Sequence, residues 1–119
     1  MDKSYILKYL LLFVILQSCI FDFNSDQQIK PNIKFGFDLN NYKVFHDTIS
    51  PGDSFGEILI KKKISYPQIY KIVQGIKDSF DIRWLTAGKP YTILSTNDSL
   101  SQPLYFIYQP NKVNYVVID

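Results

Sequence analysis

The twelve-residue stretch TISPGDSFGEIL, Thr48–Leu59, decides the interpretation of this chain, because it combines a strand end, a turn and a helix start. Within it, SPGD at residues 50–53 is typical of a turn, since proline fixes φ and glycine accepts a positive φ. Ser54 and Glu57 have the spacing of a capping box, in which the two side chains satisfy backbone N–H groups at the start of a helix. The stretch therefore predicts a sharp corner between a strand and a helix.

The residues around this corner predict one strand and two helices. Alternation over Tyr42–Ile49 indicates a strand that leads into the turn. The first helix begins at Phe55 and ends at the lysines 61–63, whose charges suit the negative end of the helix dipole. The second helix begins at another capping-box pair, Ser65 and Gln68, and carries apolar residues at helical spacing. The two faces of the predicted strand carry Phe45, Asp47 and Ile49 on one side, and Val44, His46 and Thr48 on the other.

The C-terminal part of the chain predicts three further strands. They cover residues 91–94, then PLYFIY at 103–108 and VNYVVI at 113–118. The last two are joined by QPNK at 109–112, where proline at the second position suits a type I turn. The order of strand, helix, helix, strand and hairpin predicts an α+β domain.

The N-terminal residues predict a lipoprotein signal. Two lysines precede an unbroken apolar run over residues 9–16. This run is shorter than the ~20 apolar residues that a membrane-spanning helix needs, and it matches the apolar middle of a secretory signal. LQSC, at Leu16–Cys19, resembles the bacterial lipobox, and the resemblance implies cleavage after Ser18 and a diacylglycerol on the Cys19 sulfur. An ordinary signal peptide with an incidental cysteine is the alternative.

Composition argues against an internal disulfide and against nucleic-acid binding. Cys19 is the only cysteine among the 119 residues, so no internal disulfide is expected and acylation accounts for the thiol. The formal net charge of +2 gives no strong field toward nucleic acid. Lysines 61–63, beside Tyr66 and Tyr70, are therefore interpreted as a solvated helix end and not as a nucleic-acid surface.

We expect a signal peptide over residues 1–18, the lipidated cysteine and a polar tether over 19–32, and one domain over 33–119.

The corner resembles the opening of a LysM domain, a small βααβ module that binds glycans containing N-acetylglucosamine. TISPGDSF, residues 48–55, resembles its first turn, and LTAGKPYTI, residues 85–93, resembles its closing segment. The resemblance covers residues 47–94, which we expect to form a LysM-like βααβ unit followed by the β-hairpin. Four positions depart from the family pattern: Asp47 replaces an aromatic residue, Gly56 a tryptophan, Lys63 a glycine and Val73 an asparagine.

This resemblance implies a shallow glycan groove between the first turn and the loop before the last strand of the unit. Backbone amides and carbonyls of such turns hydrogen-bond an N-acetyl group, while Arg83 and Trp84 are placed to donate to a ligand or to stack on it. Phe55 and Leu85 are alternatively core residues, and Trp84 alternatively covers the second helix. The implied groove residues are Gly52, Asp53, Ser54 and Phe55 on one side, and Trp84, Leu85, Thr86 and Ala87 on the other.

A longer stretch, residues 35–119, is similar to the region that precedes the catalytic domain in lysostaphin-type (LytM-type) zinc endopeptidases of Bacteroidetes. Those enzymes cut the peptide cross-links of peptidoglycan. Four blocks carry the similarity in order: DTISPGDSFGEIL, YPQIYKI, AGKPYTIL and FIYQPNKVNYVVID. The chain stops within an apparent strand, VVID, and the similarity favours a truncated or split endopeptidase, with a short and covered sheet edge as the alternative.

The similarity does not extend to a catalytic centre. The endopeptidases hold zinc through an H-x-x-x-D and an H-x-H segment, whereas this chain has a single histidine, His46. A catalytic zinc site needs three protein ligands and an open position. We therefore expect no enzyme activity, no metal and no cofactor, and we interpret His46 as an ordinary strand residue.

Together, these patterns predict a non-catalytic lipoprotein of the bacterial cell envelope, anchored through Cys19 to a membrane and facing the periplasm. Its expected partners are the glycan strands of peptidoglycan, or a peptidoglycan endopeptidase that it positions or inhibits. The alternative is a protein-interaction or autoinhibitory module that does not bind glycan. An enzyme that acts alone ranks third, because the supply of metal ligands is too small.

Overall fold

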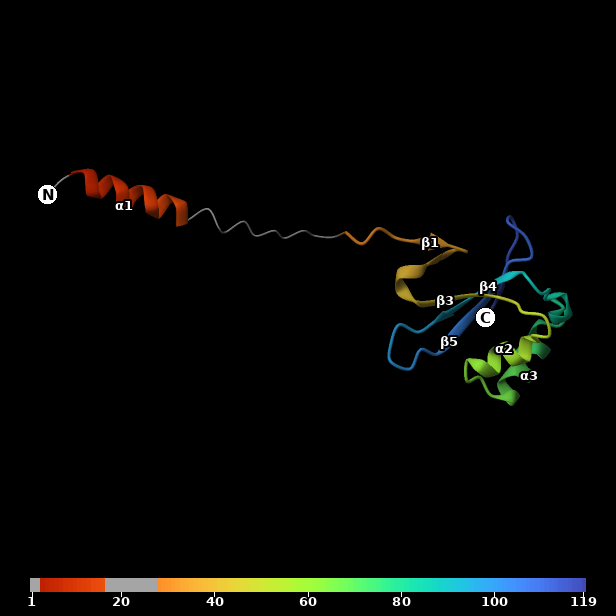
Figure 1. The fold of residues 1–119 in the computed structure, drawn as a ribbon. Coiled ribbons are helices and arrows are strands. Elements are labelled where there is room, and N and C mark those ends of the chain that lie inside the picture. Colours follow the sequence, from red (N-terminus) through yellow and green to blue (C-terminus); the bar gives the residue numbers. More distant parts are fainter. Residues whose placement is uncertain (1–2, 17–27) are drawn as a thin grey trace.

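The computed structural model describes residues 3–16 and 28–119 (Figure 1). Helix α1 (Lys3–Leu16) coincides with most of the predicted signal segment. Within the described ranges, no helix is both long enough and apolar enough to span a bilayer. Cys19 and the first part of the predicted tether lie outside the described residues, so the lipidated cysteine stays a prediction.

A four-stranded antiparallel sheet forms the centre of the domain. Its strands are β3 (Lys43–Thr48), β4 (Pro90–Ser95), β5 (Pro103–Tyr108) and β6 (Val116–Ile118), and they lie side by side in that order. β3 is an edge strand, and all of its residues are exposed. In the central strand β4, residues 91–95 are buried, because both faces of the sheet are covered. The predicted α+β class is confirmed.

Two helices lie between β3 and β4 in the chain and cover one face of the sheet (Figure 1). They are α2 (Phe55–Lys61) and α3 (Tyr66–Ile76). The Phe106 ring of β5 joins the two layers, because Phe55 meets it edge-on with centroids 5.3 Å apart and Tyr91 stacks on it at 5.2 Å. This larger core comprises Ile49, Phe55, Ile58, Leu59, Ile69, Phe80, Tyr91, Ile93, Phe106, Tyr108 and Ile118.

Side-chain hydrogen bonds fix the start of both helices. At α2, the backbone N–H of Glu57 donates to Ser54 Oγ at 3.2 Å, and the N–H of Ser54 donates to Glu57 Oε2 at 3.2 Å. At α3, the N–H of Ser65 donates to Gln68 Oε1 at 3.1 Å. Helix starts at Ser54 and Ser65 are therefore set by local sequence, as the capping-box spacing predicts.

The end of α2 is a Schellman motif with an unusual residue. The N–H of Ile64 donates to the carbonyl of Leu59 at 3.2 Å, and the N–H of Lys63 donates to that of Ile60 at 2.8 Å. This pattern requires a left-handed residue just after the helix, a position that glycine usually occupies. Lys63 holds it with a φ of 64°. Lysine at this position thus leaves the turn intact but holds a side chain in a strained conformation.

A second layer, which the sequence analysis did not predict, covers the opposite face of the sheet. It consists of the hairpin of β1 (Ile33–Lys34) and β2 (Phe37–Asp38) and of the 3₁₀ helix η2 (Leu39–Asn41). Both turn residues have positive φ, 55° at Phe35 and 82° at Gly36, as a two-residue type I′ hairpin needs. This smaller core comprises Leu39, Leu94 and Ile107, with Phe35, Phe37, Tyr42 and Tyr105 packed against it.

Two boundaries differ from the predicted ones. The last strand begins at Val116 instead of Val113, because Asn111 Oδ1 accepts the N–H groups of Val113 at 2.9 Å and Asn114 at 2.8 Å. The side chain of Asn111 thereby takes the place of a neighbouring strand as the acceptor for these two N–H groups. The predicted tether is also partly fixed, since the carbonyl of Asn32 accepts the N–H of Leu39 at 2.9 Å.

Candidate functional site

The structure brings the two predicted halves of the groove to the same end of the sheet. The N–H of Ile49 donates to the carbonyl of Lys89 at 2.9 Å, and the N–H of Gly88 donates to the carbonyl of Ile49 at 2.7 Å. These bonds continue the antiparallel pairing of β3 with β4 beyond the last paired residues, Thr48 and Pro90. The turn after β3 and the loop before β4 therefore lie side by side. We call residues 52–54 and 84–87 the turn surface.

On the side of the turn surface formed by residues 52–54, the polar side chains accept hydrogen bonds from the backbone of the turn and of α2. The N–H of Asp53 donates to the carbonyl of Ser50 at 3.0 Å, with Pro51 and Gly52 between them. Gly52 has a φ of 86°, which the third position of a type II turn requires. Asp53 Oδ2 accepts the N–H of Ser50 at 3.1 Å, and Ser54 caps α2. The groups left for a ligand here are mainly those of the backbone.

The second side is held by a tyrosine of the sheet. The N–H of Thr86 donates to the hydroxyl of Tyr108 at 3.2 Å, and this hydroxyl donates to the carbonyl of Trp84 at 3.2 Å. Thr86 Oγ1 donates to the same carbonyl at 3.0 Å. Only 2% of Tyr108 is exposed, so its ring is fixed by the larger core. Sequence reasoning did not single out Tyr108, because its partners are 22 and 24 residues away.

Trp84 is the one large ring that the turn surface presents to solvent. It ends the 3₁₀ helix η3 (Ile82–Trp84), and 66% of the residue is exposed. Phe80 meets its ring edge-on at 6.1 Å, which supports one side of the indole. Leu85 is partly buried and packs against the larger core, and Phe55 is 2% exposed within that core.

The turn surface offers two kinds of interaction to a ligand. Among the described residues, the backbone N–H groups of Gly52 and Ala87 donate to no protein acceptor. Such groups can donate to an amide carbonyl, and the exposed face of Trp84 can stack on the apolar face of a sugar ring. Arg83 is less available, because it forms a two-point pair with Asp81 in which Nη2 and Oδ2 lie 2.6 Å apart. Hydrogen bonds from Arg83 lower the pKa of the Asp81 carboxyl below its ordinary value.

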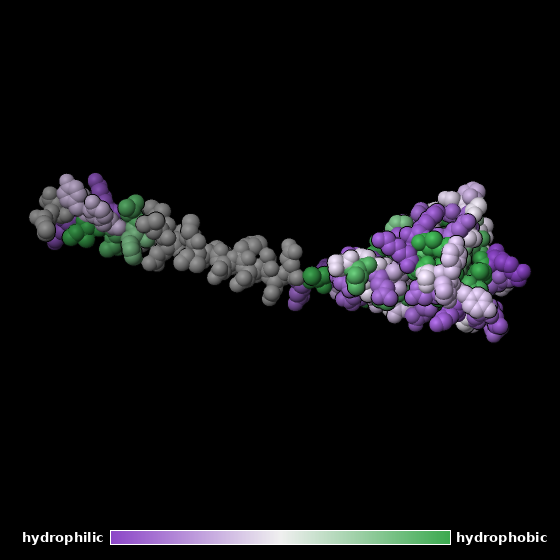
Figure 2. Space-filling model, turned by 90° about the horizontal axis from the view of Figure 1, so that it is seen from below, coloured by the Kyte–Doolittle hydropathy of each residue, from purple (hydrophilic) through white to green (hydrophobic). Residues whose placement is uncertain are grey.

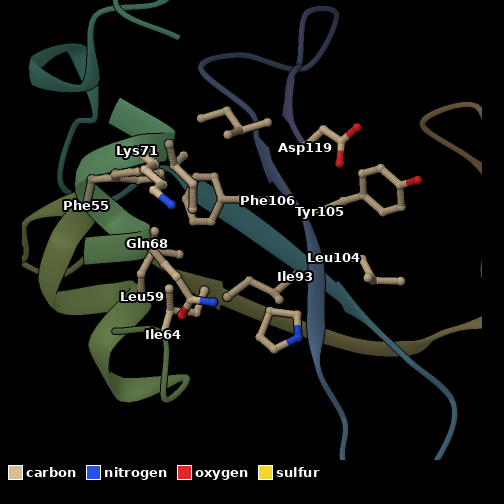
Figure 3. A pocket seen from close by; sticks show the side chains of 13 residues that line it. Phe55, Leu59, Ile64, Gln68, Lys71, Ile93, Leu104, Tyr105, Phe106 and Asp119 are labelled. Carbon is tan, nitrogen blue, oxygen red and sulfur yellow. The ribbon is translucent and has the colours of Figure 1, made fainter. Parts of the chain in front are cut away.

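A cavity of about 330 Å³ lies away from the turn surface, between α2, α3 and the sheet (Figure 3). Phe55, Leu59 and Phe106 line it with apolar side chains, while Gln68 and Lys71 of α3 supply polar groups. On the face seen in Figure 2, hydrophobic areas likewise reach the surface between hydrophilic ones. Helical spacing in the sequence indicates which residues face the sheet but not how completely they fill the gap, so this cavity was not predictable from the sequence.

The single histidine, His46, lies apart from both the turn surface and the cavity beside α3. His46 Nδ1 is 2.7 Å from the hydroxyl of Thr92, a residue of the neighbouring strand that is fully buried. In the part of the chain that the structure describes, no group of three or more histidine, cysteine or acidic side chains is arranged to hold a metal ion.

Comparisons with protein-family models, with curated proteins and with solved structures returned no significant match to this chain.

Proposed function

We propose that this chain is a lipid-anchored protein of the bacterial cell envelope whose domain binds the glycan strands of peptidoglycan. Cys19 would carry the lipid, and the turn surface would bind the glycan. The proposal is supported chiefly by the hydrogen bonds of Ile49 with Gly88 and Lys89, which bring the two halves of the turn surface together. In this proposal the chain has no catalytic centre of its own.

The chemistry of the turn surface suits an N-acetylated sugar. The N–H groups of Gly52 and Ala87 would donate to acetamido carbonyls, and Trp84 would stack on the face of one ring. The charge of the site fits as well, because Asp53 is paired with Lys61, with 3.7 Å between Oδ1 and Nζ, and Arg83 is paired with Asp81. Since these four charged side chains are paired with one another, a neutral sugar would bind there without contacting an unpaired charge among them.

Retention of the full chain on purified peptidoglycan sacculi tests this proposal. Trp84→Ala removes the exposed ring, and we expect about tenfold weaker retention, equivalent to about 1.4 kcal/mol. Tyr70→Ala is the matched control, because Tyr70 is also 66% exposed but lies on α3. Equal retention of the two variants, or no retention of the unaltered chain above an unrelated lipoprotein, would contradict glycan binding at the turn surface.

A second candidate function is supported by the cavity beside α3. An apolar cavity with an open rim suits an apolar side chain of a protein partner, and the proposed partner is a peptidoglycan endopeptidase that the chain positions or inhibits. Leu104 lines the cavity and is 39% exposed, whereas Val117 of β6 is 38% exposed and does not line it. Loss of co-purification with an endopeptidase in Leu104→Gln, but not in Val117→Gln, would favour this function, particularly if Trp84→Ala had no effect.

A further inference from the structure

A second groove, wider and more polar than the cavity beside α3, lies at the opposite end of β4 from the turn surface. It encloses about 790 Å³ between the edge strand β3, the C-terminal end of α2 and the loop that joins β4 to β5. Its described lining residues include four lysines and no carboxylate. We call it the basic groove, and its charged residues are Lys43, Lys61, Lys62 and Lys63.

The fold holds these lysines in place. Lys61 is the last residue of α2, and Lys62 and Lys63 form the Schellman turn that follows it. Lys62 Nζ lies 3.1 Å from the centre of the Phe45 ring on β3. Lys43 Nζ donates to the carbonyl of Asp98 at 2.6 Å and to Ser101 Oγ at 2.7 Å. Lys61 at the end of α2, Lys62 and Lys63 in the turn that follows it, and Lys43 on β3 all line the same groove.

This positive charge is only partly neutralised. Of the four lysines, only Lys61 forms an ion pair with a described residue, and its partner Asp53 lies 3.7 Å away. The groups that Lys43 and Lys62 contact directly are a carbonyl, a hydroxyl and an aromatic ring, none of which carries a full negative charge. The carboxyl of Asp98 is near Lys43, since its pKa is lowered chiefly by the hydrogen bond from Thr96 and to a smaller extent by the charge of Lys43. The basic groove therefore favours an anionic partner, and the exposed hydroxyl of Ser99 adds a donor for its oxygens.

An exposed apolar side chain lies beside the lysines. Leu100, in the loop between β4 and β5, is 81% exposed, and Val44 and Phe45 on the edge of the sheet are 36% and 37% exposed. All three line the basic groove. Lysines beside an exposed leucine are typical of surfaces that rest on a membrane, because the charges meet phosphates while the apolar group enters the boundary of the acyl chains. Soluble anions and nucleic acid would leave Leu100 without a role.

The chain also enters the domain close to the start of β3, the strand that borders this groove. The carbonyls of Lys30 and Asn32 accept hydrogen bonds from η2, which ends two residues before Lys43. Lys30 is 11 residues from Cys19 in the sequence. Such a segment spans at most about 40 Å at ~3.3–3.6 Å per residue. A lipid on Cys19 would therefore keep the basic groove within reach of the bilayer surface.

We infer that the basic groove docks on the phosphate headgroups of anionic phospholipids in the membrane that holds the anchor. The inference rests on the proposed anchor at Cys19, but the docking contact itself is made by Lys43, Lys62 and Lys63, because Lys61 pairs with Asp53 of the turn surface. Docking directs this end of the sheet to the membrane. The turn surface, at the other end of β4, then points away from the bilayer toward the cell wall.

Acetylation rates of individual lysines test the docking. The full chain is bound to vesicles of phosphatidylcholine, with or without phosphatidylglycerol, and labelling is measured by mass spectrometry. We expect several-fold slower labelling of the basic groove when phosphatidylglycerol is present, and loss of this protection in 1 M salt, where the Debye length falls to ~3 Å. Control lysines should label equally on both kinds of vesicle. These controls are Lys77, at the end of α3, Lys89, before β4, and Lys112, between β5 and β6.

Two variants with the same loss of charge sharpen the test. Combining Lys61→Gln, Lys62→Gln and Lys63→Gln should abolish the protection of Lys43 on anionic vesicles. Combining Lys77→Gln, Lys89→Gln and Lys112→Gln should leave it unchanged, and circular dichroism shows whether each variant folds. Equal labelling on both vesicles, or equal behaviour of the two variants, would overturn membrane docking. Protection by added nucleic acid or polyphosphate without protection by vesicles would overturn it in favour of a soluble polyanion.

The mass of the Cys19 peptide from cells separates this inference from the proposed function. An acylated Cys19 without groove protection overturns the docking alone. An unacylated Cys19 overturns the anchor, while the vesicle measurement still reports whether the basic groove binds anionic lipid. Failure to bind sacculi affects neither result.

Discussion

Removal of one hydroxyl, in Tyr108→Phe, tests whether the sheet holds the turn surface in place. The hydroxyl accepts the N–H of Thr86 and donates to the carbonyl of Trp84, both at 3.2 Å. The variant keeps the ring in the larger core and its contact with Phe80, where the centroids are 6.1 Å apart. It therefore removes the two hydrogen bonds and little else.

The structure sets the size of the effect. A net hydrogen bond contributes about 0.5–1.5 kcal/mol. The bond from the N–H of Thr86 is at the long end of its usual range, and the bond from the hydroxyl to the carbonyl of Trp84 is longer than is usual for O–H···O. Thr86 is exposed, so water can replace part of what its N–H loses. We expect the free energy of unfolding to fall by about 1–2 kcal/mol, which lowers the Tm of a domain of this size by roughly 5–15 °C.

Thermal unfolding of the full chain, followed by circular dichroism, measures this change. Tyr105→Phe is the matched control, because Tyr105 is on the same strand and its hydroxyl makes no hydrogen bond with a described residue. Its Tm should stay within a few degrees of the unaltered chain, since changes away from such contacts are usually within ~0.5 kcal/mol. The amide of Thr86 should also exchange faster in Tyr108→Phe only. If both variants lose the same stability, the hydroxyl of Tyr108 does not hold the loop.

Three further changes follow from the helices and the core. Ser54→Ala removes the acceptor for the N–H of Glu57 and should lower the free energy of unfolding by about 1 kcal/mol in urea titrations, with Ser99→Ala as a neutral control. Lys63→Gly relieves a φ of 64° and should raise that free energy by about 1 kcal/mol, so a loss of stability would contradict the Schellman assignment. Burial, with smaller contributions from Asp47 and Asp53, raises the pKa of Tyr91 above its ordinary value of 10.0. The unfolded chain then binds fewer protons than the folded chain above that pH, so stability should fall as the pH rises past 10, and Tyr91→Phe should make this fall shallower.

Local signals were sufficient for the centre of the fold. The corner at residues 48–59 contains its own turn and cap, and β3 and α2 lie where these residues predict them. The second helix and β5 followed in the same way, from the cap at Ser65 and from PLYFIY. In each case the residues that determine the element lie within it or beside it.

The hairpin of β1 and β2 could not be predicted in this way. Its turn places Phe35 at a φ of 55°, and phenylalanine is not a residue that indicates a type I′ turn. The hairpin is stabilised by distant partners instead, since Phe37 packs on Tyr105 with centroids 4.6 Å apart. Non-local packing of this kind leaves no pattern within a short window of sequence.

The candidate site was predictable only where local sequence determines it. Gly52 and the loop from Trp84 to Ala87 were identified from turn residues and from the resemblance to LysM domains. The hydroxyl of Tyr108 was missed, because strand alternation indicates which way the ring points but not which loop it meets. The basic groove was interpreted only as the end of a helix, since Lys43 and Leu100 join the lysines 61–63 through the sheet.

Amide chemical shifts of the isotope-labelled full chain, titrated with soluble glycan fragments of peptidoglycan, give the most direct test of the glycan proposal. The proposal predicts that the largest, saturable changes fall on residues 52–54 and 84–87, with the indole N–H of Trp84 among them. Lys62 and Lys63, in the basic groove, should change little, whereas Lys61 is left out of this comparison because it pairs with Asp53 of the turn surface. An absence of changes, or changes confined to the cavity beside α3 or to the basic groove, would contradict glycan binding at the turn surface.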